Sequence, residues 1–261
     1  MSDEDFIIEL FWRIDESLKD VPKHSQASLY PSEVVTLALL FALKGGHSRA
    51  FYRWLKKNWR KLFPHLPHRT RLFRLFVSHQ ALTERFMAEP SLLGVIDSYG
   101  IELIHPVREG RSEQQIGKKG LSNKRWIVGG KLCLLLNHLG LVVDWDFDTA
   151  NVYDAVFQPL ITKVMDTMLV FADSHFHAAA GDPPNLKICP KGTWNERMVM
   201  ETVLSMVTTI CHFKKVFHRT WDQFKMHLAF TMVLFNILTQ WDGLEPDDTG
   251  FVPLTIAQFS L

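Results

Sequence analysis

The sequence contains few cysteines and no long apolar run, and these absences narrow the classes of protein it can belong to. Its three cysteines show neither close pairing nor metal-ligand spacing, which argues against a disulfide scaffold and favours a reducing compartment. The longest apolar runs, residues 34–43 and 228–235, are too short to span a bilayer. Residues 3–5 are acidic where a secretory signal would be basic. We therefore expect a soluble cytoplasmic protein without membrane association.

Acidic residues are absent from positions 34 to 83, although the whole chain has 28. This window holds ten basic residues, so its local charge is +10, and the remaining 19 basic residues leave the rest of the chain at −9. A long basic window without acids favours a polyanionic partner. Beside Lys44, it contains the nine residues that we expect to contact DNA: Arg49, Arg53, Lys56, Lys57, Arg60, Lys61, Arg69, Arg71 and Arg74.

Residues 1–90 are predicted to be all-helical, as the first of two domains. Residues 3–20 are amphipathic, and Pro31 opens a strongly apolar helix that ends at Gly45. Two further helices, one beginning at Ser48 and one over 69–87, carry most of the basic residues on outward faces. This pattern is typical of a helix-turn-helix-like DNA-binding region. The alternative is a basic helical surface without a specific partner.

Residues 91–261 are predicted to form the second domain, an α/β domain with a mixed sheet. Its element order is typical of a ribonuclease-H-like fold flanked by helices, and we expect the stretch 108–124 to be a mobile loop. The last long helix is expected to cover the sheet. The predicted strands are 92–96, 126–136, 141–147, 168–172 and 186–189, and the predicted helices are 151–165, 193–212 and 221–241.

Three carboxylates occupy distinctive places in this pattern. Asp97 ends the first predicted strand, Asp173 ends the fourth, and Glu201 lies on the helix after the fifth. The first and fourth strands of such a sheet are neighbours, so the aspartates can converge and the glutamate can approach from the helix. Converging carboxylates repel one another unless a cation is present, and their oxygens suit Mg²⁺ or Mn²⁺. Two such ions can activate water for phosphodiester cleavage.

The helix that carries Glu201 is predicted to start at a capping box formed by Thr193 and Glu196. Because Glu196 is used by the cap, Glu201 is the acid left for chemistry. Arg197 lies one turn before it. Taken alone, an Arg–Glu pair at this spacing favours a solvated ion pair worth a few tenths of a kcal/mol. The two strand-end aspartates favour the catalytic interpretation instead.

Over most of its length the chain resembles bacterial insertion-sequence transposases of the DDE class. One large group of these enzymes carries the signature Tyr-(2)-Arg-(3)-Glu-(6)-Lys around its third acid. Here Trp194, Arg197, Glu201 and Thr208 stand at those positions. The arginine and the glutamate match, the tryptophan is an aromatic replacement, and the threonine departs from the pattern. The segment 151–154 also resembles the family.

The resemblance implies metal-dependent hydrolysis at transposon ends, followed by attack of the freed 3′-hydroxyl on target DNA. Asp97, Asp173 and Glu201 would hold two Mg²⁺ or Mn²⁺ ions, and Arg197 would orient Glu201 or a phosphate. The implied partner is double-stranded DNA, both the terminal inverted repeats and the target. The protein would act as a homodimer on DNA, associated with the bacterial nucleoid.

Further DNA contacts are expected outside the basic window. In the family, the lysine that Thr208 replaces helps to hold terminal DNA, and Lys214 or Lys215 could take that role. Lys118 and Lys119 either contact DNA near the site or belong to a solvated loop.

Two rival functions use the same residues. A structure-selective metal nuclease would cut without strand transfer. An inactive or repurposed DNA-binding derivative is weakly favoured by Thr208 and opposed by the intact acids Asp97, Asp173 and Glu201.

Several other residues permit a functional and a structural interpretation. His175 and His177, on an extended segment with Asp173, could be ligands of a zinc-type hydrolase, but no third ligand with suitable spacing is found, which favours loop residues. Asp154 is expected to start a helix. A solvated strand face is favoured for the alternating acids Asp144, Asp146 and Asp148. Core positions are favoured for Trp12, Trp54, Trp59 and Trp126.

Overall fold

The computed structural model describes residues 1–113, 115–122, 124–190, 197–210, 212, 220–244, 256 and 258–259, with residues 197 and 198 described by their backbone alone. The chain divides into two compact units. The helical unit comprises Met1–Phe86, Val207–Trp241 and Thr255–Leu261, and the sheet unit comprises Met87–Met206 and Asp242–Leu254. The sequence-based division at residue 90 assigns Val207–Trp241 to the sheet domain. In the structure this segment belongs to the same unit as the N-terminal helices.

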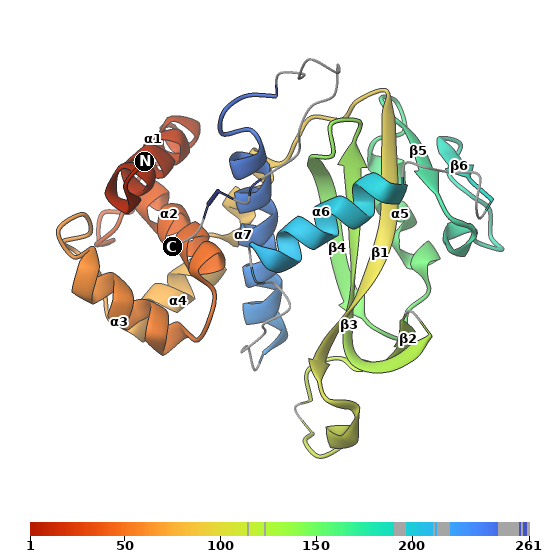
Figure 1. Cartoon of the computed structure of the whole chain (residues 1–261), viewed down its shortest axis with the longest axis horizontal. Helices are drawn as coiled ribbons and strands as arrows, with labels where there is room; N and C mark the ends of the chain where they lie inside the picture. The colour runs from red at the N-terminus through yellow and green to blue at the C-terminus, as the bar shows by residue number, and fades with distance from the viewer. Residues whose placement is uncertain are drawn as a thin grey trace. The chain divides into compact units, whose positions relative to one another are not determined.

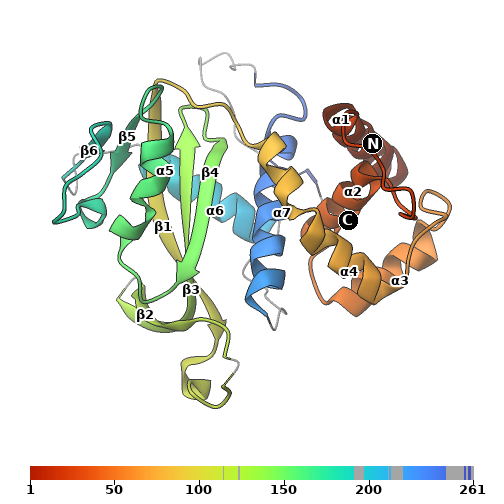
Figure 2. The ribbon, with the colours of Figure 1, turned by 180° about the vertical axis from the view of Figure 1, so that it is seen from behind.

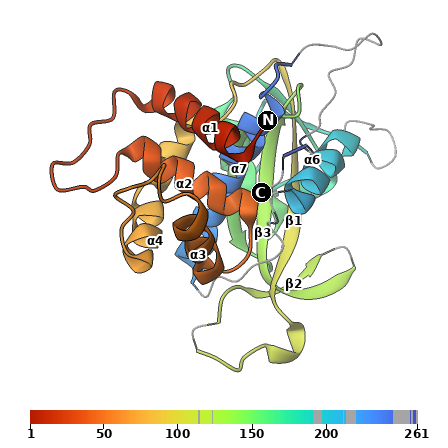
Figure 3. The ribbon, with the colours of Figure 1, turned by 60° about the vertical axis from the view of Figure 1, so that its left-hand side comes forward.

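The N-terminal helices form where the sequence predicts them, with one exception. Helix α1 (Asp3–Leu18) begins at a capping box made by Ser2 and Asp5, and α2 (Pro31–Lys44) and α3 (Ser48–Asn58) follow. Figure 3 shows α2, α3 and α4 (Arg69–Ser78) close together, and α2 contacts both of the others. The predicted helix 69–87 is interrupted: α4 ends at Ser78, and a 3₁₀ segment, η1 (Gln80–Phe86), follows.

Side chains at the end of α4 explain this interruption. The Ser78 hydroxyl donates to the Leu75 carbonyl oxygen at 3.0 Å, and His79 Nδ1 lies 2.9 Å from the same oxygen. Such local side-chain bonds compete with the helical backbone pattern and favour a helix end.

Helix α7 (Trp221–Thr239), which the sequence analysis assigned to the sheet domain, belongs to the helical unit and packs there against α2, α4 and η1. Its residues are buried on every side of the helix, which therefore needs neighbours all round. The ring of Phe230 lies 6.4 Å from that of Phe76, and the ring of His227 lies 5.5 Å from that of Phe41. No helix in the described ranges has the length and apolar composition that crossing a bilayer requires.

The sheet unit is built on a six-stranded mixed sheet (Figure 1), which confirms the predicted α/β class. The strand order is β2-β3-β1-β5-β6, and β4 also pairs with β3. Strands β1, β2 and β4 run antiparallel to β3, whereas β5 runs parallel to β1 and β6. The strands are β1 (Leu93–Ile104), β2 (Lys118–Ser122), β3 (Arg125–Asn137), β4 (Val142–Thr149), β5 (Leu169–Ala172) and β6 (Leu186–Ile188).

Two sequence-based expectations about this sheet are wrong. β1 continues to Ile104, so Asp97 lies within the strand instead of at its end. The predicted loop 108–124 contains β2, which pairs along the start of β3. The inward position of β2 is Gly120, where an added Cβ would lie 1.9 Å from the Ala150 carbonyl oxygen. A strand whose inward residue is glycine shows no apolar alternation, so its sequence does not carry the usual strand signal.

Helices cover both faces of the sheet. Figures 1 and 2, which view the molecule from opposite sides, show α5 (Gln158–Lys163) over one face and α6 (Arg197–Thr209) over the other. A short 3₁₀ segment, η3 (Asp154–Phe157), precedes α5. A second one, η4 (Ser174–Phe176), follows β5. The core beneath α5 includes Ile96, Cys133, Val170, Ala172, Phe157 and Ile161.

Candidate functional site

Asp97 lies on β1, and Asp173 directly follows β5, the parallel neighbour of β1. The register pairs Val95 of β1 with Phe171 of β5, and two more residues on each strand lead to Asp97 and Asp173. β5 ends at Ala172, so Asp173 directly follows its last residue. Neighbouring strands are about 4.8 Å apart. The two predicted site residues therefore belong to neighbouring strands, one within β1 and one directly after β5.

The side chain of Asp97 belongs to the face covered by α6. Its neighbour Ile96 lies in the core beneath α5, and its other neighbour, Ser98, donates from its hydroxyl to Asp154 at the start of η3. Successive residues of a strand point to opposite faces, so Asp97 points away from α5. Glu201 is exposed on α6, the helix of that opposite face.

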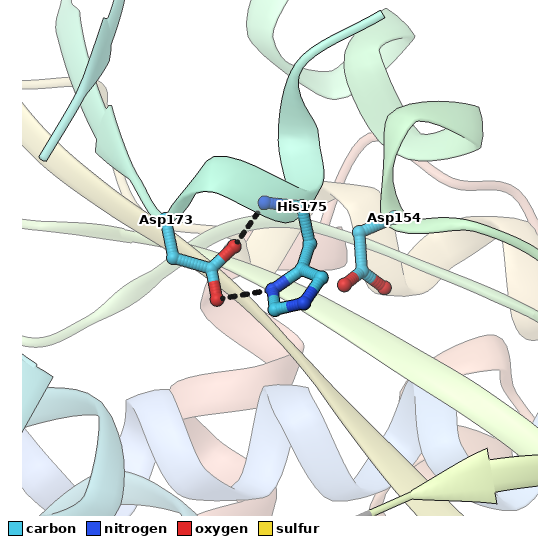
Figure 4. Close-up of side chains that lie close together, drawn as sticks. All are labelled: Asp154, Asp173 and His175. Atoms are coloured by element: carbon cyan, nitrogen blue, oxygen red, sulfur yellow. Dashed lines mark hydrogen bonds and ion pairs between the residues drawn. The ribbon is translucent and has the colours of Figure 1, made fainter. Parts of the chain in front are cut away.

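Asp173 is also part of a second group, with Asp154 and His175 (Figure 4). One potential ligand atom from each of the three lies within 4.8 Å of the others. Asp97 and Glu201 are not members of this group. Asp154 starts η3, which confirms the predicted start of helical structure there, whereas its closeness to Asp173 was not predicted.

Asp154 is held by a network of hydrogen bonds. Its Oδ1 accepts from the Ser98 hydroxyl at 2.7 Å and from Lys131 Nζ at 2.8 Å. Lys131 Nζ also donates to the Val152 carbonyl oxygen at 2.7 Å. This network joins β1, β3 and η3, and the lysine charge balances that of the aspartate. Asp154 is thereby fixed beside His175.

His175 is bound to Asp173 in a tight turn. Asp173 Oδ1 accepts from the backbone N–H of His175 at 2.9 Å, and Asp173 Oδ2 lies 3.0 Å from His175 Nδ1. This hydrogen bond and the charge of Asp173 raise the pKa of His175, with a further contribution from Asp154, while desolvation and Lys131 oppose the rise. When it is protonated, the imidazole balances part of the acidic charge.

The zinc-type alternative with His175 and His177 loses its geometric basis. The segment from Ser174 is a 3₁₀ turn, so the two histidines do not share the face of an extended strand. His177 Nδ1 lies 2.8 Å from Asp182, which also accepts from the Ala178 N–H at 2.9 Å. These contacts, the backbone bond first, lower the pKa of Asp182.

Part of the predicted signature lies outside the described residues. Thr193, Trp194, Glu196, Lys214 and Lys215 belong to this part, and only the backbone of Arg197 is described, at the start of α6. Glu201 and Thr208 both lie on α6, and the described helix ends at Thr209 instead of 212.

The basic window is mainly exposed. In the described part of the chain, none of its ten cations has a carboxylate within ion-pair distance, and Arg69 is half-buried with its guanidinium 3.5 Å from the Ser48 hydroxyl. Lys118 and Lys119 are exposed on β2, and Lys119 pairs with Glu109 at 3.1 Å. The exposed members of the window are Arg49, Arg53, Lys56, Lys57, Arg60, Lys61, Arg71 and Arg74.

Sequence reasoning did not identify Ser98 and Lys131 as parts of the site. Their role depends on the register of β1, β3 and η3, which single residues do not reveal. The signal for Asp154 was its place in the segment 151–154 that resembles the transposase family. Comparisons with protein-family models and with curated proteins find no match for this chain.

Proposed function

We propose that this chain is a metal-dependent DNA transposase of the DDE type, with a ribonuclease-H-like catalytic domain. The observation that supports the proposal is the parallel pairing of β1, which contains Asp97, with β5, which Asp173 directly follows. The sequence-based hypothesis requires the first and fourth predicted strands to be neighbours, and β1 and β5 correspond to those strands. Two carboxylates that converge from neighbouring strands would repel each other, so such a pair would favour a cation site.

The strand order supports the ribonuclease-H-like interpretation. β4, β3 and β1 alternate in direction, and β5 and β6 then continue parallel to β1. The helix with the third acid lies over the face to which Asp97 points (Figures 1 and 2). Glu201 lies on α6, the helix from which the hypothesis expects the third acid to approach, and this supports the proposal.

The donor set fits Mg²⁺ or Mn²⁺. Asp97, Asp173 and Glu201 would hold the ions, because carboxylate oxygens are the ligands these cations prefer. Asp173 keeps a defined orientation through its two bonds to His175. When bound, the ions would supply activation of the attacking oxygen and stabilisation of the leaving oxygen.

The protein's own side chains would position the DNA. The exposed cations of α3 and α4 would contact phosphates without reading base sequence. Lys131 and Ser98 would hold Asp154, and Asp154 and His175 would fix the turn that carries Asp173. Arg197 would contact a phosphate beside Glu201, since a guanidinium can bind two phosphate oxygens at once.

The test is a cleavage and strand-transfer assay on the DNA that flanks the coding region. With Mg²⁺, the full chain should release a 3′-hydroxyl at a terminal inverted repeat and join it to target DNA. Asp97→Asn and Asp173→Asn should lose both products while the exposed control Asp166→Asn retains them. Cut DNA that is never joined would identify a nuclease instead. Uncut DNA with the wild-type chain would refute the catalytic proposal.

A further inference from the structure

The hairpin of β2 and β3 exposes an aromatic and basic face. Leu121 and Trp126 are paired across the two strands and therefore lie on the same face. They are 56% and 58% exposed. The expectation that Trp126 is a core residue is therefore wrong.

The opposite face of this hairpin explains the exposure. Gly120 is buried and touches the backbone of Ala150, and its cross-strand partner Ile127 is only 2% exposed. Residues adjacent to these along each strand must point the other way. Leu121 and Trp126 are therefore directed outward by the packing of Gly120 and Ile127.

The outward face is accompanied by positive charge. Residues 118–126 contain four basic residues and no acid, and the four are exposed. Lys119 Nζ lies 5.7 Å from the centre of the Trp126 ring. Glu109 and Glu102 balance two of the charges, at 3.1 Å from Lys119 and 3.4 Å from Arg125. Lys119 shares the outward face with Leu121, whereas Lys118 and Arg125 alternate onto the other face and Lys124 directly precedes β3.

We propose that this hairpin face, formed by Leu121, Trp126 and Lys119 with Lys124 beside it, binds single-stranded DNA by stacking an unpaired base on the Trp126 indole. The inference rests on the proposed function in taking DNA as the partner. An open aromatic ring beside exposed lysines matches the two parts of a single strand, its base faces and its phosphates. In a duplex the base faces are already stacked on one another, so the indole has no base to receive.

This surface would hold strand ends or locally opened DNA. The cations attract the phosphates of the strand from a distance. The indole then stacks on one of its unpaired bases. Because stacking does not depend on base identity, the hairpin would bind with little sequence preference.

The experiment measures binding in EDTA, so that it does not depend on cleavage. The full chain is titrated onto a labelled oligothymidylate of about 20 nucleotides, longer than one typical binding site, and onto a duplex of equal length. The variants are Trp126→Ala, Trp126→Phe and the matched control Trp12→Ala, which removes a 64% exposed tryptophan from α1.

Trp126→Ala should weaken single-strand binding by about fivefold or more, which is the loss of one stacked base. Trp126→Phe should keep most of the affinity, Trp12→Ala should keep all of it, and duplex binding should be nearly unchanged in each. A central 2-aminopurine in the oligonucleotide should be quenched by the wild type and not by Trp126→Ala. Thermal melting should confirm that each variant is folded.

Three results would overturn the inference. The first is unchanged single-strand binding by Trp126→Ala. The second is an equal loss of affinity for duplex and single strand in this variant. The third is a loss of self-association of the variant on a sizing column without a loss of DNA binding. Failure of the proposed function has a different signature, since missing Mg²⁺-dependent cleavage leaves this metal-free binding intact.

Discussion

Lys131 Nζ lies 2.8 Å from Asp154 Oδ1, and the two side chains are only 13% and 14% exposed. The pair joins the central strand β3 to the start of η3. Removing one member of such a pair leaves the other charge with little access to water. Its stability contribution should therefore differ sharply from that of the exposed pair between Lys163 and Asp144, which has a similar distance of 2.7 Å.

Lys131→Met should lower the free energy of unfolding by about 3 kcal/mol, because breaking a largely buried ion pair leaves one buried charge without its partner. The matched control Lys163→Met removes a lysine that is 65% exposed and should cost about 1 kcal/mol or less. Urea denaturation measures both. Adding Asp154→Leu to Lys131→Met should recover much of the loss. Equal costs for the two single variants would show that burial of the pair is not what matters.

Glu201→Gln should reduce Mg²⁺-dependent cleavage by roughly a hundredfold or more, a rise of about 2.7 kcal/mol in the barrier. The reason is that an amide oxygen is a weaker ligand than a carboxylate for a hard cation. Glu196→Gln is the control, because the sequence assigns Glu196 to the helix cap. Both rates are measured at saturating Mg²⁺. If the control loses activity and Glu201→Gln does not, the third acid was misassigned.

Arg197→Lys should slow cleavage about tenfold while leaving the thermal melt unchanged. Lysine keeps the charge but cannot bind two phosphate oxygens at once, which removes a contact worth ~1.5–3 kcal/mol. A wild-type rate would mean that the arginine only pairs with Glu201 on the surface of α6.

DNA binding by the basic window should depend strongly on salt. If roughly six of its cations contact phosphates, log K against log salt should have a slope of about −5. Replacing Arg53, Lys56 and Arg60 with Gln should make the slope less negative by about 3, whereas Lys163→Gln should leave it unchanged. Salt-independent binding by the wild type would exclude this electrostatic mode.

Cys133 should resist alkylation in the folded protein. Burial, followed by the charge of Asp154, raises the pKa of its thiol well above the ordinary 9.0, so the reactive thiolate is scarce. Above pH 9.0 the unfolded chain releases this proton while the folded chain retains it, so the contribution of Cys133 to stability falls as pH rises. In a Cys211→Ser background, Cys189, which is half-buried, should react first. Rapid labelling of Cys133 at neutral pH would contradict its burial.

Much of the sheet could be predicted from sequence because its central strands are apolar runs. The hairpin of β3 and β4, the parallel strand β5 and the short β6 lie close to their predicted ranges. β2 was missed because Gly120 occupies its inward position and leaves no apolar residue to show the period. The second half of β1 was missed because Asp97 and Ser98 interrupt the apolar run.

The candidate site could be predicted only in part. The placement of Asp173 after a buried strand is a local property, and the structure has it there. The group of Asp154, Asp173 and His175 is not local, because it depends on which strands are neighbours and on their register. The apolar composition of α7 likewise predicts burial without indicating the partner that buries it.

The membership of α7 in the helical unit affects how the chain can be made. Helix α2 leaves the ribosome early, yet α7, which packs against it, is synthesised after the entire sheet. Contacts between residues so distant in sequence form slowly and leave apolar surface uncovered in the meantime. A fragment that ends at residue 90 lacks this helix and should aggregate, because its apolar surface stays uncovered until α7 is made.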